Sequence, residues 1–292
     1  MILEHKKIAF VINPNAGVKK KINVIEFIKD NFPKTIDYDL IVWKNANDFD
    51  SVKQQIIIGK YTIVVACGGD GTVNMVAATV ADTTMAMAIL PLGSGNGLAR
   101  SNGIPLKLKE ALKVIVNARI KKIDGALING IPFFCTAGVG FDALIAAKFA
   151  ASTKRGLVTY FKTSVREFFS YKPNDYKITV DGNTITTKAF LITVANAGQW
   201  GNDVYISPEA SLNDGILHVS ILKPFVMPSI VPIGIKLFMK KIHTSAHLLS
   251  LNGKHIEIEF TGNLPVHFDG EPLAVENKIT IDIRPDSLKV VC

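Results

Sequence analysis

The chain has 292 residues, 48% hydrophobic and 20% charged, which is enough to bury the core of one large domain or two modest ones. Its three scattered cysteines exclude a disulfide framework or a cysteine zinc site, and the N-terminal residues show no export signal, so we expect a cytoplasmic protein. The longest weakly charged stretch, residues 224–239, contains three prolines, which excludes a membrane-spanning helix, and the net charge of +8 favours anionic partners.

The first part of the chain alternates short apolar runs with helix-like segments, a pattern typical of a parallel sheet covered by helices. Each recognisable loop motif follows the C-terminal end of a predicted strand, where open α/β sheets bind their ligands. The predicted strands are 8–12, 38–43, 62–66 and 85–90, and the predicted helices are 23–30, 72–81 and 109–118. We therefore expect an open α/β nucleotide-binding domain over residues 1–123.

After residue 123 the pattern changes to alternating apolar and polar residues broken by Asp-Gly and Asn-Gly pairs, as in KIDGALING and LLSLNGKHI. This predicts antiparallel strands joined by hairpins, forming a β-sandwich domain over residues 124–284. One helix is predicted where apolar residues recur at helical spacing between Leu157 and Phe169. The final residues, 285–292, are expected to return to the first domain.

The segment VVACGGDGT leads from an apolar run into three glycines, one acid and one hydroxyl. Glycines let backbone N–H groups turn towards a phosphate, and the next helix adds its partly positive N-terminus. Asp70 would repel phosphate unless a divalent cation lay between them, and Thr72 can cap the helix or donate to a phosphate. The alternative is a tight strand-to-helix turn with Asp70 at the surface.

Two further loops strengthen the interpretation as a nucleotide site. PLGSGNGLAR follows another predicted strand, and NPNAG, residues 13–17, is followed by three lysines. No GxxxxGK[ST] pattern is present, which excludes a P-loop NTPase. GVGFDA, residues 138–143, matches a dinucleotide fingerprint but lacks the acid that would bind a ribose, and His243 with His247 lacks a third metal ligand nearby.

Taken together with FDGE at residues 268–271, these motifs resemble the diacylglycerol kinase catalytic-domain superfamily, which includes bacterial soluble diacylglycerol kinases, YegS-like lipid kinases and sphingosine kinases. The resemblance covers nearly the whole chain. It implies an NAD-kinase-like first domain that binds ATP and a second domain that holds a lipid alcohol. The implied nucleotide contacts are Asn13, Pro14, Gly17, Gly68, Gly69, Asp70, Gly71, Thr72, Gly93, Ser94, Gly95 and Asn96.

The resemblance also assigns the acidic residues. Asp70 and Asp124 would hold the catalytic Mg²⁺, partly through water, and Asp269, or else Glu271, would be the base. A structural Mg²⁺ turn is implied in SPEASLNDGILHV, with the Asp214 side chain and backbone carbonyls near Ser211 and Ile216 as ligands. The alternative for that segment is a simple turn at the entry to a strand.

One departure leaves the acceptor open. Bacterial diacylglycerol kinases usually carry an aspartate where this chain has Gly97, and GSGNG is more similar to sphingosine kinases. We expect an ATP-dependent lipid kinase; the alternatives are a kinase of a soluble substrate, as in NAD kinases, and a non-catalytic nucleotide or lipid sensor. The expected partner is a lipid at the inner face of a membrane, with peripheral docking through basic segments at 154–166 and 236–243. Homodimerisation is left open, and nucleic acid is not expected.

Overall fold

The computed structural model describes residues 7–14, 23–43, 48–150 and 157–292, so Gly17 among the predicted nucleotide contacts lies outside the described residues. The chain divides into two compact units. The first unit comprises Met1–Ile123 together with Asp286–Cys292, and the second comprises Asp124–Pro285. The second unit is therefore inserted between two parts of the first.

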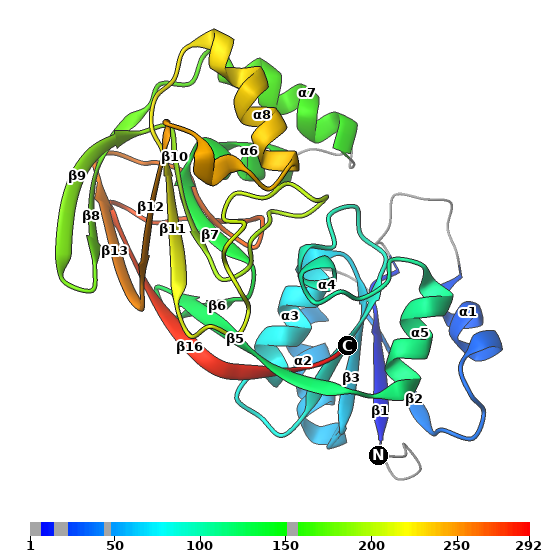
Figure 1. Cartoon of the computed structure of the whole chain (residues 1–292). Coiled ribbons are helices and arrows are strands. Elements are labelled where there is room, and N and C mark those ends of the chain that lie inside the picture. Colours follow the sequence, from blue (N-terminus) through cyan, green and yellow to red (C-terminus); the bar gives the residue numbers. More distant parts are fainter. Residues whose placement is uncertain (1–6, 15–22, 44–47, 151–156) are drawn as a thin grey trace. The chain divides into compact units, whose positions relative to one another are not determined.

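The first unit contains a parallel sheet with strand order β2-β1-β3-β4. The strands are β1 (Ile8–Ile12), β2 (Tyr38–Val42), β3 (Ile63–Gly68) and β4 (Ala86–Pro91). The helices are α1 (Val24–Asn31), α2 (Phe49–Gly59), α3 (Asp70–Val80), α4 (Gly97–Ser101) and α5 (Leu108–Asn117). Every residue of β1, β3 and β4 is buried, because α2 and α3 lie on one side of these strands and α5 on the other (Figure 1). This confirms the predicted open α/β fold.

The predicted elements of this unit all exist, with ends that move by one or two residues. The difference from the prediction that affects the candidate site is the start of α3. This helix begins at Asp70 instead of Thr72, so Asp70 lies in the first helical turn. Helix α2 is missing from the prediction, because its run of three isoleucines at residues 56–58 shows no helical spacing.

The second unit is built from two antiparallel sheets, which confirms the predicted sandwich. One sheet contains β5 (Ile120–Ile128), β6 (Ile131–Phe133), β8 (Asn174–Val180), β9 (Asn183–Ala189), β13 (His255–Phe260) and β16 (Lys278–Val291). The other contains β7 (Thr136–Gly140), β10 (Leu191–Ala195), β11 (Leu217–Leu222), β12 (Leu248–Gly253), β14 (Val266–Phe268) and β15 (Glu271–Leu273). Buried side chains of both sheets form one core cluster, so the sheets pack face to face.

Three of the predicted turn pairs form two-residue hairpins, at 129–130, 181–182 and 269–270, and both residues of each pair have positive φ. Two other pairs belong to strands and do not form two-residue hairpin turns, so the turn prediction is wrong there. Asp124 with Gly125 belongs to β5, and Asn252 with Gly253 ends β12. At Asp124, a hydrogen bond from the distant Gly215 amide to the buried carboxylate takes the place of the local turn.

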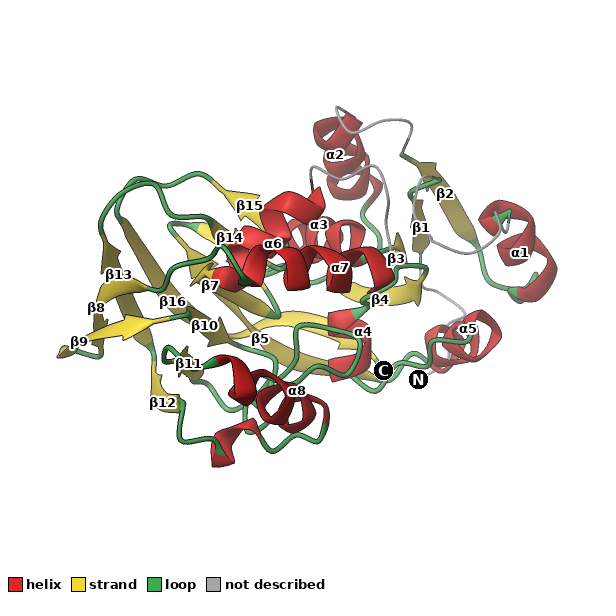
Figure 2. Cartoon of the chain, turned by 90° about the horizontal axis from the view of Figure 1, so that it is seen from above, coloured by secondary structure: helices red, strands yellow, loops and turns green. Residues whose placement is uncertain are grey.

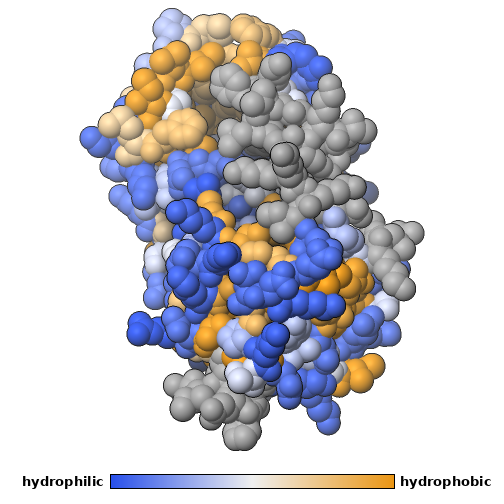
Figure 3. All heavy atoms as spheres, turned by 90° about the vertical axis from the view of Figure 1, so that its right-hand side faces the viewer, coloured by the Kyte–Doolittle hydropathy of each residue, from blue (hydrophilic) through white to orange (hydrophobic). Residues whose placement is uncertain are grey.

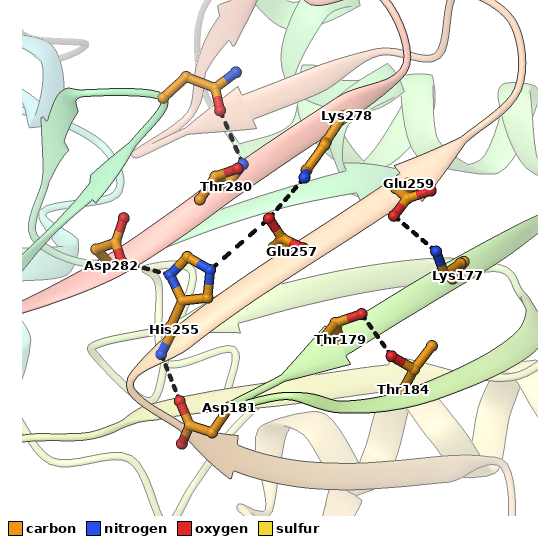
Figure 4. A network of polar contacts seen from close by, with 11 residues as sticks. Lys177, Thr179, Asp181, Thr184, His255, Glu257, Glu259, Lys278, Thr280 and Asp282 are labelled. Atoms are coloured by element: carbon orange, nitrogen blue, oxygen red, sulfur yellow. Dashed lines mark hydrogen bonds and ion pairs between the residues drawn. The ribbon is translucent and has the colours of Figure 1, made fainter.

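The outer face of the first sheet of this unit is a network of charged and polar side chains (Figure 4). His255 Nδ1 lies 2.7 Å from the Asp282 carboxylate, and Lys278 Nζ donates to Glu257 over 2.6 Å. These residues alternate along β13 and β16 with buried isoleucines of the core. The alternation predicted from the sequence therefore separates a solvated face from the apolar interior.

Three helices accompany the second sheet of this unit: α6 (Phe141–Ala150), α7 (Leu157–Phe168) and α8 (Ile230–Phe238), the last preceded by a 3₁₀ turn, η2 (Met227–Ser229) (Figure 2). Only α7 is predicted from its apolar spacing, because the apolar residues of α6 are not confined to one face and α8 contains a proline and a glycine. Among the described residues, no helix is long and apolar enough to span a membrane.

Candidate functional site

The loops that follow β1, β3 and β4 meet at one edge of the parallel sheet, because these strands are neighbours and run in the same direction. Asn13, just after β1, donates its backbone N–H to the Cys67 carbonyl over 3.1 Å and its Nδ2 to Thr72 Oγ1 over 3.2 Å. Leu92, after β4, donates its backbone N–H to the Gly68 carbonyl over 2.9 Å. Hydrogen bonds thus connect all three loops.

Glycines allow the two loops after β3 and β4 to touch through their backbones. A Cβ added to Gly93 would lie 2.7 Å from the Cα of Gly69, and one added to Gly95 would lie 2.7 Å from Asp70 Oδ2. Neither contact could relax without moving a backbone or displacing the carboxylate. Gly93 and Gly95 are therefore required first of all by the packing of the second loop on the first.

Asp70 joins the two loops through both of its carboxylate oxygens. Oδ2 accepts the backbone N–H of Asn96 over 3.0 Å, and Oδ1 accepts that of Gly97 over 2.7 Å. Burial raises the pKa of Asp70, while these two amides and the nearby Arg100 act in the opposite direction. The carboxylate is thus held in one position at the start of two helices.

The second loop is stiffened by Asn96, which adopts a left-handed conformation with φ of 51°. Its Nδ2 donates to the Gly93 carbonyl over 2.8 Å, and its Oδ1 accepts the Gly93 N–H over 3.0 Å. Arg100 Nε donates to the Gly95 carbonyl over 3.1 Å. These hydrogen bonds hold the loop in one shape. Ser94 lies within this loop.

These residues fit a nucleotide with its magnesium ion. The first turn of α3 carries backbone N–H groups that have no partner within the helix, at Gly71 and Thr72, and such groups bind phosphate oxygens. Asp70 is a carboxylate whose pKa is raised by burial, and a nearby cation would stabilise its charged form. Mg²⁺ in nucleotide sites is typically held by one or two carboxylates together with phosphates and water.

In the second unit, Asp269 occupies the turn between β14 and β15 with φ of 47°, followed by Gly270 with φ of 85°. The Asp-Gly pair therefore forms a hairpin turn, and the carboxylate has a further role. Its oxygens accept the backbone N–H groups of Phe134, Cys135 and Thr136 over 2.9, 2.8 and 3.0 Å. Asp269 is anchored to the start of β7, and its negative charge is stabilised by main-chain donors.

Glu271 is the first residue of β15 and pairs across the hairpin with Phe268. Its side chain is exposed, in contrast to the anchored carboxylate of Asp269. The two acids thus differ in environment, although only one residue separates them. The assignment of the base to Asp269, with Glu271 as the alternative, stays a prediction.

The predicted metal residues of this unit lie around one turn. Asp124, buried in β5, accepts the Gly215 N–H over 2.8 Å, and its own N–H donates to the Leu212 carbonyl. Asp214 accepts the N–H groups of Ser211 over 3.3 Å and Ile216 over 3.2 Å, and His218 Nε2 lies 3.1 Å from it.

This turn is closed by its own hydrogen bonds. The hydrogen bond from the Gly215 N–H to the Asp124 carboxylate places Asp124 beside the turn that contains Asp214. The sequence does not indicate this link. The hydrogen bonds within the turn are those expected of a simple turn before β11, which is the alternative interpretation. The roles of Ser211, Asp214 and Ile216 as metal ligands stay a prediction.

A buried polar cluster next to the base candidate is absent from the predicted site. Asp142 Oδ2 accepts the Thr193 hydroxyl over 2.7 Å and lies 3.3 Å from His267 Nε2, two residues before Asp269. All three side chains are buried. The signal in the sequence was an isolated histidine in an apolar strand and an isolated aspartate in an apolar helix, the latter within GVGFDA. His267 belongs to β14, so this cluster holds the strand that directly precedes Asp269.

Residues 7–128 match the family model described as the diacylglycerol kinase catalytic domain. Residues 135–292 match the model described as the YegS C-terminal NAD kinase beta sandwich-like domain. The chain is 29% identical over 254 residues to the Klebsiella pneumoniae (strain 342) protein named "Probable lipid kinase YegS-like", a match that covers 85% of this chain and 84% of the relative. It is 23% identical over 231 residues to a diacylglycerol kinase of Bacillus subtilis (strain 168), covering 77% and 76% of the two chains.

Solved structures show the same fold. A diacylglycerol kinase crystal structure from Bacillus anthracis superposes with a TM-score of 0.74 at 22% identity, covering 98% of this chain and 96% of that one. An NAD kinase from Archaeoglobus fulgidus in complex with ATP superposes with a TM-score of 0.55 at 12% identity, covering 98% and 93%. The fold therefore occurs in kinases named for lipid and for dinucleotide acceptors.

Proposed function

The chain belongs to the diacylglycerol kinase catalytic-domain family of lipid kinases, and we propose that it transfers the γ-phosphoryl group of ATP to the hydroxyl group of a lipid alcohol. The observation that carries this proposal is the pair of glycine loops held together by Asp70. Phosphoryl transfer depends mainly on positioning and charge neutralisation, which backbone N–H groups and a fixed carboxylate supply. A sensor would need the donors but no anchored base.

Within the first unit, the residues of the three loops would bind the nucleotide. The backbone N–H groups at the start of α3 would face the phosphates, and Thr72 Oγ1, already within 3.2 Å of Asn13 Nδ2, would add a hydroxyl. Mg²⁺ would be held through Asp70, with Asp124 proposed as a further ligand through water. When bound, the ion would neutralise the charge that develops on the transferred group.

Asp269 is the proposed acceptor of the proton from the lipid hydroxyl. A carboxylate that accepts hydrogen bonds from three amides is fixed in place at the end of β14. A strong base is not required, because the transition state of phosphoryl transfer is loose and catalysis depends mainly on positioning and electrostatic stabilisation. Glu271, which is exposed, would contribute less.

The acceptor is proposed to be a membrane lipid of the diacylglycerol or sphingoid-base type. The test is incubation of the purified protein with γ-labelled ATP and Mg²⁺ against a diacylglycerol, a sphingoid base and NAD. Labelled product from one of the lipids, with none from NAD, is expected. Label in NAD alone would favour the soluble-substrate kinase, and nucleotide binding without transfer to any acceptor would favour the sensor.

A further inference from the structure

Helix α8 is apolar on two opposite faces. One face, with Ile233 and Leu237, packs on a core cluster that includes Phe190 and Leu222. The other face is exposed to solvent. Among the described residues, this second apolar face of α8 has no packing partner.

The exposed face of α8, together with exposed apolar residues that flank the helix on both sides, forms a stripe that we call the α8 stripe. Its members are exposed by between 52% and 68%, values far above those of the core. The stripe consists of Val226, Met227, Val231, Ile235, Phe238 and Met239. Val231, Ile235 and Phe238 lie on α8, whereas Val226 and Met227 precede this helix and Met239 follows it. Protein surfaces expose single apolar residues routinely, but six of them grouped along one short segment mark a contact surface.

Further apolar residues lie at the end of α7. Phe168, its last residue, packs against Phe225, which precedes η2, with ring centroids 5.7 Å apart. The neighbouring Phe169 is 69% exposed. Figure 3 shows orange, apolar side chains gathered at the top left of the view, the position that α8 takes when Figure 1 is turned. The stripe is thus part of a broader apolar surface on the second unit.

The charged residues of the chain segment that carries the stripe have one sign. The chain contains no aspartate or glutamate between Gly215 and Ile256. In the same segment, Lys236 lies within α8, and Lys240 and Lys241 follow it directly. Lys236 Nζ donates to the Thr244 carbonyl over 2.9 Å, and Lys240 Nζ lies 4.3 Å from the centre of the Tyr205 ring. An apolar stripe beside cations, in a segment free of acids, fits an anionic lipid surface.

We propose that the α8 stripe docks on an anionic bilayer, with its apolar side chains in the interfacial region and the lysines facing lipid phosphates. This inference rests on the proposed function, since a lipid substrate must be reached at a membrane. A second copy of the chain fits less well, because a two-fold contact through the stripe would bring the lysines of both copies together. The docking is interfacial, by one face of a helix of nine residues.

The test uses the full-length protein and sedimentation with vesicles of phosphatidylglycerol and phosphatidylcholine, compared with pure phosphatidylcholine. Val231, Ile235 and Phe238 are replaced by glutamine, which keeps the helix and removes the apolar surface. The matched control replaces Ile57 and Ile58 of α2, which are 53% and 76% exposed. The α8 variant is expected to bind the anionic vesicles about tenfold or more weakly, while the control binds like the wild type.

Insertion is read out separately with Phe238→Trp, whose fluorescence should shift to the blue on anionic vesicles, while Ile58→Trp should not shift. Both glutamine variants should melt like the wild type, since the replaced side chains are exposed. Wild-type-like vesicle binding by a folded α8 variant would overturn the proposal. So would a wild-type dimer in sedimentation equilibrium that the α8 variant abolishes without any change in vesicle binding.

Failure of docking and failure of the proposed function can be told apart with a short-chain, monomeric lipid alcohol as acceptor. If docking is correct, the α8 variant should phosphorylate this acceptor like the wild type but lose activity on the same lipid in anionic vesicles. Equal activity of both proteins on vesicles overturns the docking and leaves the kinase function intact. Vesicle binding through α8 without transfer to any lipid overturns the function and leaves the docking intact.

Discussion

The two units hold a key carboxylate in the same way but draw the donors from different distances along the chain. In the parallel unit, the amides that bind Asp70 are 26 and 27 residues away, in the loop after the next strand. In the antiparallel unit, the amides that bind Asp269 are 133 to 135 residues away. A parallel sheet gathers a site from consecutive loops, whereas this sandwich gathers one from strands that are far apart in the sequence.

The largest effect is expected at the carboxylate of the parallel unit. Asp70→Ala should lower kcat/KM for phosphoryl transfer by about 10³ or more, because it removes the proposed cation ligand, and several kcal/mol of charge stabilisation depend on it. It should also lower the melting temperature, because the amides of Asn96 and Gly97 lose their acceptor. Asp50→Ala, which removes the first-turn acid of α2, is the control. Wild-type turnover in the Asp70 variant would exclude the cation role.

Substitutions of the two candidate bases test the carboxylate site of the antiparallel unit. Asp269→Asn should lower turnover by about 10² or more and Glu271→Gln by less, because only the anchored acid accepts the proton. Asparagine cannot keep all the hydrogen bonds, since its NH₂ group would face an amide donor, so stability should fall as well. Rates measured with the identified lipid decide the order, and a larger effect at Glu271 would assign the base to that residue.

Loss of stability is separated from loss of the base by Asp181→Asn. Asp181 also opens an Asp-Gly hairpin turn, and its carboxylate accepts the amides of Lys254 and His255. This variant should lose stability as the Asp269 variant does, yet keep its turnover. If both variants slow the reaction equally, Asp269 acts only as an anchor.

The same contrast explains how far the sequence could be interpreted. The glycine loops were predictable, because each consists of adjacent residues and the strand order of a parallel sheet brings them together. Asp269 could be found from its turn, but its anchoring amides could not, since their register with β14 depends on the whole second sheet. The same holds for Asp124, whose Asp-Gly pair predicts a turn until Gly215 is placed beside it. Asp142 and His267 carry no local pattern at all.

A smaller effect should follow from a methyl group in the first site. In Gly93→Ala the added Cβ would lie 2.7 Å from the Gly69 Cα, so the loops must separate, and we expect a loss of about 1–3 kcal/mol in stability with weaker ATP binding. Gly234→Ala is the matched control, because no atom lies within 4 Å of its added Cβ in α8. The control should be neutral or stabilising, by up to about 1 kcal/mol. Equal urea midpoints for both variants would show that the loops do not need glycine.

The smallest effect is expected on the outer face of the sandwich. The Asp282 side chain raises the pKa of His255 above its ordinary value of 6.5, so the folded state binds this proton more tightly than the unfolded state. The resulting stabilisation is complete below the unfolded pKa and is lost as the pH rises through the folded pKa. Since His255 is 47% exposed, solvent screens the pair and the change is small.

Urea midpoints of the wild type and Asp282→Asn, measured from pH 5 to pH 9, should differ at the acid end and converge at the alkaline end. A difference that is independent of pH would show that the pair contributes through contacts other than the charge on His255.

Strand β16 has a consequence for the order in which the protein is made. Its early residues pair with β13, Val290 pairs with Met87 of β4, and the backbone N–H of Cys292 donates to the Arg119 carbonyl. A ribosome therefore synthesises the whole inserted unit before it supplies the segment that completes the sheet of the first. Until then one edge of β4 is unpaired. Nascent chains interrupted before residue 286 should therefore be recognised by chaperones and proteases, because the first unit is incomplete even when the inserted unit has already folded.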